Sequence, residues 1–296
     1  MRFIKGEIMH YKESKGILSQ KNNMNIYRGC THGCIYCDGR STCYQFKHQY
    51  DDVEVKVNAT KLLEQALRSK RKKCIIGTGY ISDSYMQCEK ELEITRQCLA
   101  LIDKYNFGVT IQTKSKLILR DLDILKKINS KTKCVIQMTL TTYDEQLCKY
   151  IEPNVCSTRE RYETLKILRD NNIPTVVWIA PILPYINDTK ENIQGLLNYC
   201  KELHVKGIVC YGIGVTLREG NRQFFYQKLD AYFPGTRELY ERKFSNNYYC
   251  ASDNEDYFMR IIKKFCDDNN ILLNQEVFDY MYEYVDQQAG YQLELF

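Results

Sequence analysis

The chain has 296 residues, a formal net charge of +5 and 44% hydrophobic residues. This length can bury one large core, and no apolar run is long enough to span a membrane, so we expect a soluble protein. The modest positive charge permits an anionic partner without requiring one. The N-terminus lacks the apolar segment of a signal peptide, and 14 cysteines without a secretory context favour a reducing cytoplasm.

The first part of the chain leads into a cysteine-rich segment. Residues 1–23 are polar and irregular, and we expect them to form an N-terminal lead-in that covers one end of the fold. Residues 24–27 are expected to form a short strand. Directly after it, Cys30, Cys34 and Cys37 follow one another at the spacing Cys-x3-Cys-x2-Cys.

Apolar runs then alternate with amphipathic segments, which indicates a parallel β/α architecture. The expected strands are 74–77, 108–112, 134–138, 175–179 and 207–211, and the expected helices are 58–69, 87–105, 122–128, 143–150, 157–170 and 188–203. With residues 24–27 this makes six β/α units, too few for a closed eight-fold barrel. We therefore expect a partial, open (β/α)6 barrel over residues 24–215, followed by a helical C-terminal appendage over residues 216–290.

The three cysteines indicate a metal centre with an open coordination position. Thiolates are the usual ligands of iron–sulfur clusters, which normally take four. No fourth cysteine follows at a matching spacing, since the next is Cys43 in a polar segment. Three thiolates would leave one iron free to bind a substrate or cofactor. The alternative is a structural zinc site, which needs a fourth ligand such as His32 or His48.

The active site of a parallel β/α fold lies at the carboxyl ends of its strands. This rule nominates the segments that follow the expected strands, namely 30–37, 77–83, 113–115, Thr139 and 180–187. Lys114 lies among them, at the same edge as the cysteines. Its ammonium group is therefore placed to pair with the carboxylate of a ligand.

The cysteine spacing, with an aromatic residue before the last cysteine, resembles the radical S-adenosylmethionine (SAM) superfamily. The resemblance extends to its spore photoproduct lyase-like, or DNA repair photolyase-like, branch and covers most of residues 24–215. The segments that carry it are 27–41, Ser82-Asp83, Thr113–Ser115 with Arg120-Asp121, Glu152-Pro153 and 181–188. It implies the same partial-barrel fold.

The resemblance also implies the chemistry of the site. The three cysteines would hold a [4Fe-4S] cluster whose open iron chelates SAM, and reduction would cleave SAM to a 5′-deoxyadenosyl radical. The residues it places at SAM are Tyr36, Ser82, Lys114 and Thr139, with Lys114 at the carboxylate. The electron would come from a donor such as flavodoxin or ferredoxin.

Two positions depart from the lyase pattern. The lyase has a hydrogen-donating cysteine in the loop after the second strand, where this chain has Tyr80, and a tyrosine after the third cluster cysteine, where it has Asp38. A phenol can donate hydrogen, although its bond is stronger than that of a thiol. Tyr80 and Tyr36 are therefore the candidate catalytic residues, and the departures separate the chain from the lyase reaction proper.

The expected function is radical SAM chemistry on a DNA lesion. Two alternatives stay open, namely radical modification of a peptide, RNA or small molecule, and a non-catalytic iron–sulfur protein that binds nucleic acid. Residues 291–296 resemble the peptide by which bacterial polymerases and repair proteins bind the sliding clamp, through Gln292, Leu293, Leu295 and Phe296. The competing interpretation is that this tail folds back onto the core.

Overall fold

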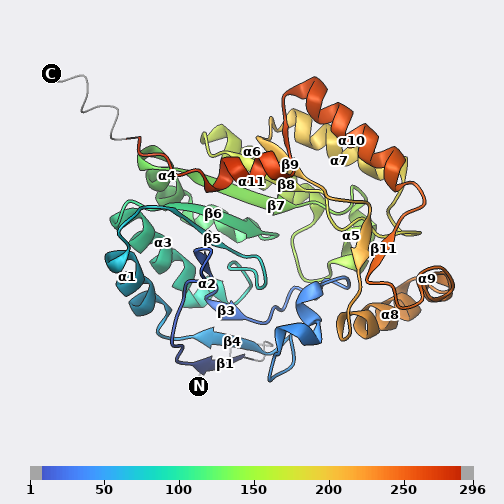
Figure 1. Cartoon of the computed structure of the whole chain (residues 1–296), viewed down its shortest axis with the longest axis horizontal. Coiled ribbons are helices and arrows are strands. Elements are labelled where there is room, and N and C mark those ends of the chain that lie inside the picture. Colours follow the sequence, from blue (N-terminus) through green and yellow to red (C-terminus); the bar gives the residue numbers. More distant parts are fainter. Residues whose placement is uncertain (1–8, 288–296) are drawn as a thin grey trace.

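The computed structural model describes residues 9–287. The candidate clamp-binding tail lies outside the described residues and stays a prediction. The centre of the fold is a seven-stranded parallel sheet with the spatial order β12-β9-β8-β7-β6-β5-β2 (Figure 1). Its strands are β2 (Asn23–Met24), β5 (Ile75–Thr78), β6 (Gly108–Thr113), β7 (Cys134–Thr139), β8 (Thr175–Trp178), β9 (Gly207–Val209) and β12 (Leu272–Leu273).

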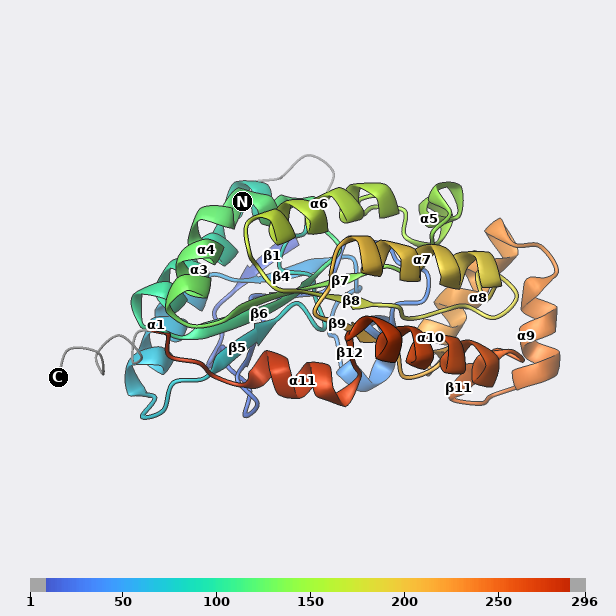
Figure 2. The same cartoon turned by 90° about the horizontal axis from the view of Figure 1, so that it is seen from above.

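Helices cover both faces of this sheet. Figure 2 shows one layer of helices on one face and α11 (Gln275–Tyr282) on the other. The layer consists of α3 (Ile94–Lys104), α4 (Leu122–Lys131), α6 (Thr158–Asp170) and α7 (Lys190–Glu202), with α1 (Ala59–Ser69) packed against α3 and α10 (Glu255–Asn269) against α7. Because both faces are buried, the strands have continuous apolar sequences. Ile136 faces the helix layer, whereas Val135 packs on Val277 of α11.

The alternation of strands and helices confirms the expected open α/β architecture. In the described chain β2 and β12 are the two free edges of the sheet, so the barrel does not close. The helix expected over residues 87–105 is divided into α2 (Glu89–Leu92) and α3, because Glu93 adopts a positive φ of 50°. Asp144 caps the helix α5 (Glu145–Ile151), and a capping box at Ser157 opens α6 as its sequence indicates.

The N-terminal expectation is wrong in one respect, because part of the lead-in is a strand. β1 (Met9–Lys12) pairs in parallel with β4 (Val53–Lys56), and β3 (Tyr27–Arg28) pairs antiparallel with β4. The single strand expected at 24–27 is thus split between the main sheet and this small one. The partners in β1 and β4 lie 44 residues apart, as His10 and Glu54 do, and those in β3 and β4 lie 26 to 28 residues apart, so local sequence carried no signal for this small sheet. The cysteine segment consequently starts between the two sheets, and the 3-10 turns Asp38–Arg40 and Thr42–Tyr44 follow it.

The C-terminal part contains strands as well as helices. The helices α8 (Asn221–Tyr232) and α9 (Thr236–Phe244) break where Pro234-Gly235 and residues 245–247 indicate. The expectation of a helical appendage over residues 216–290 is incomplete, because β10 (Gly214–Thr216) pairs with β11 (Tyr249–Ala251) and β12 extends the main sheet. Strands of two or three residues are too short to show a periodic pattern. Within residues 9–287, no helix combines the length and the apolar character needed to cross a lipid bilayer.

Candidate active site

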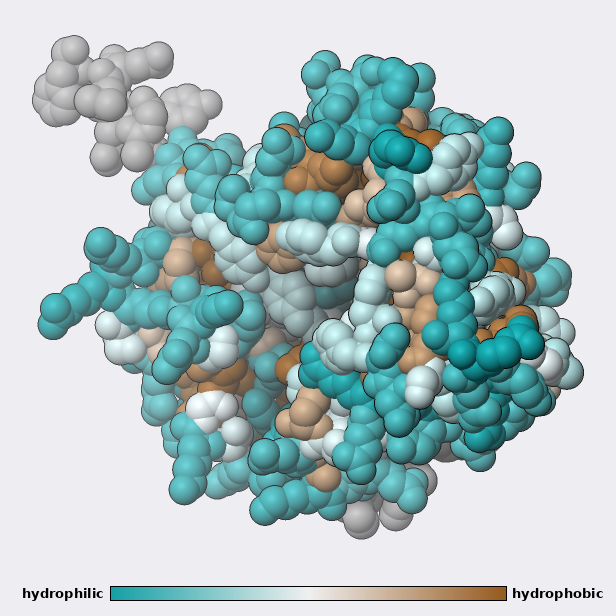
Figure 3. Space-filling model, turned by 45° about the vertical axis from the view of Figure 1, so that its right-hand side comes forward, coloured by the Kyte–Doolittle hydropathy of each residue, from teal (hydrophilic) through white to brown (hydrophobic). Residues whose placement is uncertain are grey.

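The carboxyl ends of the strands surround a cavity of about 410 Å³. Tyr36 and Cys37 line it from the cysteine loop, Lys114 from the segment after β6, and Thr139 and Trp178 from the ends of β7 and β8. A hollow of intermediate hydropathy, bordered by hydrophilic residues, is visible near the middle of the face in Figure 3. Of the site residues expected from the sequence, this cavity is lined by Tyr36, Cys37, Tyr80, Lys114 and Thr139, whereas Cys30, Cys34 and Ser82 are not among its lining residues.

The cysteine loop is tightly held. Cys30 and Cys34 are buried and Cys37 is partly exposed. The backbone N–H of Cys30 donates to the carbonyl of Tyr50 at 2.9 Å, and the Tyr50 hydroxyl lies 3.3 Å from Sγ of Cys37. Gly29 has φ +95°, and a Cβ there would lie 2.6 Å from the same Tyr50 carbonyl, so only glycine fits at the start of the loop.

The spacing of the thiols favours a cluster over a single ion. Among the described residues, the one set of three metal-ligating side chains whose ligand atoms all lie within 4.8 Å of one another is His10, His48 and Asp52. At least one pair of the three cysteine sulfurs is therefore more than 4.8 Å apart, wider than the ligands of a single tetrahedral zinc ion. His48 packs against His10 and groups with His10 and Asp52 rather than with the cysteines, which disfavours it as the single fourth ligand that a zinc site would need. Burial raises the pKa of the Cys30 thiol to about 12, so binding of a metal would release its proton.

Asp83 fastens the loop after β5 to the end of β6. Its carboxylate accepts from the Thr113 hydroxyl at 2.8 Å and from the backbone N–H of Lys114 at 2.8 Å. It also lies 3.6 Å from Nδ1 of the buried His32, the second candidate zinc ligand. Because all three contacts converge on one carboxylate, Asp83 sets the position of Lys114 relative to the cysteine loop. Sequence reasoning named Asp83 only as part of a motif and assigned it no role.

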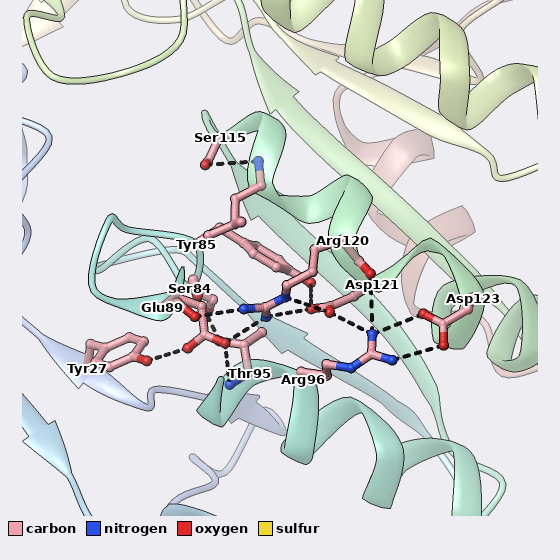
Figure 4. A network of polar contacts seen from close by, with 11 residues as sticks. Tyr27, Ser84, Tyr85, Glu89, Thr95, Arg96, Ser115, Arg120, Asp121 and Asp123 are labelled. Carbon is pink, nitrogen blue, oxygen red and sulfur yellow. Dashed lines mark hydrogen bonds and ion pairs between the residues drawn. The ribbon is translucent and has the colours of Figure 1, made fainter. Parts of the chain in front are cut away.

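A second network of polar contacts, shown in Figure 4, connects the cysteine loop to the loop after β5. The Arg120 guanidinium lies 2.9 Å from carboxylate oxygens of both Glu89 and Asp121, and neither carboxylate is exposed. Glu89 accepts from the hydroxyl of Tyr27, directly before the cysteine loop. Asp121 accepts from the hydroxyl of Tyr85 at 3.0 Å. The network therefore joins the entry of the cysteine loop to the loop that carries Ser82 and Asp83.

Two buried hydroxyl groups of the described chain lack a protein partner, that of Thr139 in the cavity lining and that of Ser82, which follows the lining residue Ile81 in the chain. Among the described residues, Oγ of Ser82 and Oγ1 of Thr139 are buried and make no hydrogen bond. Buried polar groups normally have a partner, and leaving one unsatisfied costs about 1–3 kcal/mol. Both residues were expected to contact SAM. Their unsatisfied hydroxyls fit a polar ligand at this place.

Lys114 is an unpaired cation in the cavity wall. None of the carboxylates in the described part of the chain forms an ion pair with it, and its Nζ lies 5.9 Å from the centre of the Tyr36 ring. Burial disfavours its charge, but the nearby Cys34 and Glu152 outweigh that effect and raise the pKa of Lys114. The ammonium group therefore stays charged and available for the carboxylate of a ligand.

The hydroxyl of Tyr36 is bound to a buried ion pair that sequence reasoning did not predict. Its hydroxyl donates to Glu152, which pairs with Arg161 of α6. Arg161 in turn donates to the carbonyl of Thr139 at 2.7 Å. Arg161 gave no signal of its own, because an arginine within an amphipathic helix is normally solvent-exposed.

Tyr80 lines the same cavity, and its hydroxyl is engaged in hydrogen bonds. It lies 2.8 Å from the hydroxyl of Tyr282 in α11 and accepts from Nε2 of Gln137 at 2.9 Å. Burial raises the pKa of Tyr80, so the phenol stays protonated. The two candidate catalytic tyrosines therefore both face the cavity with their rings, while their hydroxyls are bound to protein groups.

Comparison with known proteins identifies one family. Residues 24–217 match the family model of the radical SAM superfamily. An uncharacterized protein of Methanocaldococcus jannaschii is 35% identical over 169 residues, which cover 56% of this chain and 62% of that protein. An uncharacterized protein of Mycobacterium tuberculosis is 26% identical over 236 residues, which cover 74% of this chain and 67% of that protein. The chain thus spans less than two thirds of the archaeal relative's length.

Solved structures give a similar fold. Spore photoproduct lyase complexed with dinucleoside spore photoproduct superimposes with a TM-score of 0.64 and 14% identity. The superposition covers 90% of this chain and 81% of the lyase. At this identity the similarity establishes the fold alone.

Proposed function

This chain belongs to the radical SAM superfamily, and we propose that Cys30, Cys34 and Cys37 hold the [4Fe-4S] cluster that the enzymes of this superfamily use together with SAM. When bound and reduced, the cluster supplies the electron that cleaves SAM to a 5′-deoxyadenosyl radical. The burial of the loop and the wide spacing of its thiols support this assignment. Three thiolates leave a coordination position for SAM.

We propose that Lys114, Ser82 and Thr139 bind SAM. The unpaired ammonium group of Lys114 pairs with the SAM carboxylate, since a partly buried cation without a counter-charge gains from an anionic ligand. The hydroxyls of Ser82 and Thr139 hydrogen-bond to polar groups of the ligand, which satisfies both.

We propose that the substrate is a lesion in DNA. The observation that carries this proposal is the aromatic lining of the cavity, to which six rings contribute: Tyr36, Tyr44, Tyr80, Trp178, Tyr211 and Tyr249. Aromatic side chains stack on nucleobases, and enzymes that act on a base take it out of the duplex into such a pocket. The lyase of similar fold was solved with a dinucleoside lesion, which supports the same substrate class here.

The test combines the reconstituted, anaerobically reduced protein with SAM and a synthetic dinucleoside spore photoproduct, and then with ultraviolet-irradiated DNA. Mass spectrometry of the nucleosides follows the loss of the lesion. We expect lesion loss with the wild-type chain and none with Cys34→Ala. Formation of 5′-deoxyadenosine without lesion loss on either substrate would contradict a DNA lesion as substrate, while leaving the radical chemistry intact.

A further inference from the structure

A second, larger cavity lies on the outer side of the cysteine loop. It measures about 1350 Å³ and shares no lining residue with the cavity that contains Lys114. Its lining includes Thr31, His32 and Gly33, the three residues between Cys30 and Cys34. Its other walls come from the 3-10 segment Lys116–Asp121 and from α6 and α8. We call it the outer groove.

The outer groove reaches the backbone that joins two of the cysteines. Asn154 is the side chain that braces this backbone, donating from Nδ2 to the carbonyl of Thr31 at 2.9 Å. Its backbone N–H donates to the carbonyl of His32 at 3.2 Å. A molecule in the outer groove therefore approaches the cysteines through a single layer of chain. A molecule at the other cavity would compete with SAM and substrate.

The charges of the outer groove favour an acidic partner. Six cationic and three acidic side chains line it: Arg40, Lys90, Lys116, Arg120, Arg159 and Lys228 against Asp51, Glu160 and Glu163. Since Arg120 already pairs with the buried Glu89 and Asp121, the uncompensated excess is two positive charges. Within residues 9–287, Lys90 and Lys228 form no ion pair, while Lys116 pairs with Glu160 at 2.5 Å. Uncompensated surface cations attract an anionic surface and accelerate encounter with it.

The same groove also has apolar lining residues. Leu117, Leu119, Phe224 and the 40%-exposed Ile167 contribute to its lining. Apolar residues surrounded by charged ones are typical of protein–protein interfaces. The interfaces of electron-transfer complexes are small. The volume and composition thus fit a protein surface better than a small ligand.

We propose that the outer groove docks the acidic one-electron carrier protein that reduces the cluster. This inference rests on the proposed cluster ligands Cys30, Cys34 and Cys37. In the step it serves, the carrier loses one electron and the [4Fe-4S] group goes from the 2+ to the 1+ state, with no atom or proton transferred. Lys90 and Lys228 provide the electrostatic attraction, and the segment 31–33 is the point of closest approach.

The test compares two double variants of equal charge change in the cluster-loaded protein. Lys90→Glu/Lys228→Glu alters the outer groove, and Lys61→Glu/Lys263→Glu alters exposed positions on α1 and α10. Titration calorimetry with a bacterial flavodoxin measures the dissociation constant at low and at high salt. At low salt we expect the dissociation constant of the groove variant to be at least tenfold larger than that of the wild-type chain. At high salt this difference should be smaller, because salt screens exposed charges. The dissociation constant of the control variant should not change.

A kinetic readout separates docking from chemistry. With dithionite, which needs no docking surface, the groove variant should form 5′-deoxyadenosine at the wild-type rate, and with reduced flavodoxin it should be slower. An unchanged dissociation constant for flavodoxin would overturn the proposal, and so would a groove variant that loses affinity for DNA but not for flavodoxin, since the groove would then be a nucleic-acid surface. If the wild-type chain forms no 5′-deoxyadenosine with dithionite, the proposed function is contradicted. The flavodoxin titration would still show whether the carrier binds in the outer groove.

Discussion

The guanidinium of Arg161 lies 2.5 Å, Nη2 to Oε2, from the carboxylate of Glu152, and neither side chain is exposed. Through this pair the hydroxyl of Tyr36 is connected to the carbonyl of Thr139 at the end of β7. Arg161 and Lys114 keep the pKa of Glu152 below its usual value although burial opposes this. The pair is therefore ionised, and it joins the cysteine loop to the sheet.

Glu152→Gln should destabilise the protein strongly. It leaves the buried Arg161 guanidinium without a counter-charge, and breaking one partner of a buried pair costs about 3–5 kcal/mol. The matched control is Glu163→Gln, which breaks the exposed pair of Glu163 with Arg159 and should cost less than about 1 kcal/mol. Anaerobic thermal unfolding of both variants measures the difference. Equal melting temperatures would show that the pair does not support the loop.

Replacing any one of Cys30, Cys34 and Cys37 by Ala should abolish the visible absorbance of the reconstituted protein. Each change removes one thiolate ligand of the proposed cluster. The control is Cys74→Ala, a partly buried cysteine just before β5, which should retain the absorbance and the iron content. Retention in all three loop variants would refute the assignment of the ligands.

Lys114→Ala should weaken SAM binding and leave the cluster in place. It removes the charge that we propose to pair with the SAM carboxylate, and a loss of about 1.4 kcal/mol or more is at least tenfold in the dissociation constant. Lys126→Ala, on an exposed face of α4, is the control. Equilibrium binding of SAM to the oxidised, cluster-loaded variants is the measurement, and an unchanged affinity would mean that Lys114 is not a ligand-binding residue.

Tyr80→Cys should raise activity on spore photoproduct. Tyr80 lines the cavity but its hydroxyl is bound by Tyr282 and Gln137, and a thiol gives up hydrogen more readily than a phenol. Tyr80→Ser creates the same space without a thiol and is the matched control. The measurement is the yield of repaired dinucleoside from the Tyr80→Cys and Tyr80→Ser variants. Equal yields would leave Tyr80 without a role in the hydrogen transfer.

The sequence predicted the parts of the fold that local patterns encode. Apolar runs such as residues 134–138 mark buried parallel strands, and Ser157 with Glu160 marks a helix start. The strands β1, β4, β10, β11 and β12 could not be predicted, because each is short and depends on a partner far away in the chain. Their stability comes from pairing, which no window of sequence contains.

The candidate site also contains residues that the sequence predicts and residues that it does not. The cysteines, Lys114 and Thr139 follow from spacing and from their positions at strand ends. Asp83 and the pair Glu152–Arg161 act through contacts with the loop, sheet and helix that surround them, and those contacts exist only after the chain has folded. Sequence reasoning therefore nominated the groups that we propose to face the ligand and assigned no role to those that position them.

The central claim is that Cys30, Cys34 and Cys37 hold a cluster that cleaves SAM beside Lys114. The most direct measurement is the formation of 5′-deoxyadenosine after anaerobic reconstitution, reduction with dithionite and addition of SAM, in the wild-type chain and in Cys34→Ala. We predict 5′-deoxyadenosine and methionine from the wild-type chain and neither from Cys34→Ala. An intact cluster, seen by its absorbance, that yields no 5′-deoxyadenosine in the wild-type chain would contradict this account.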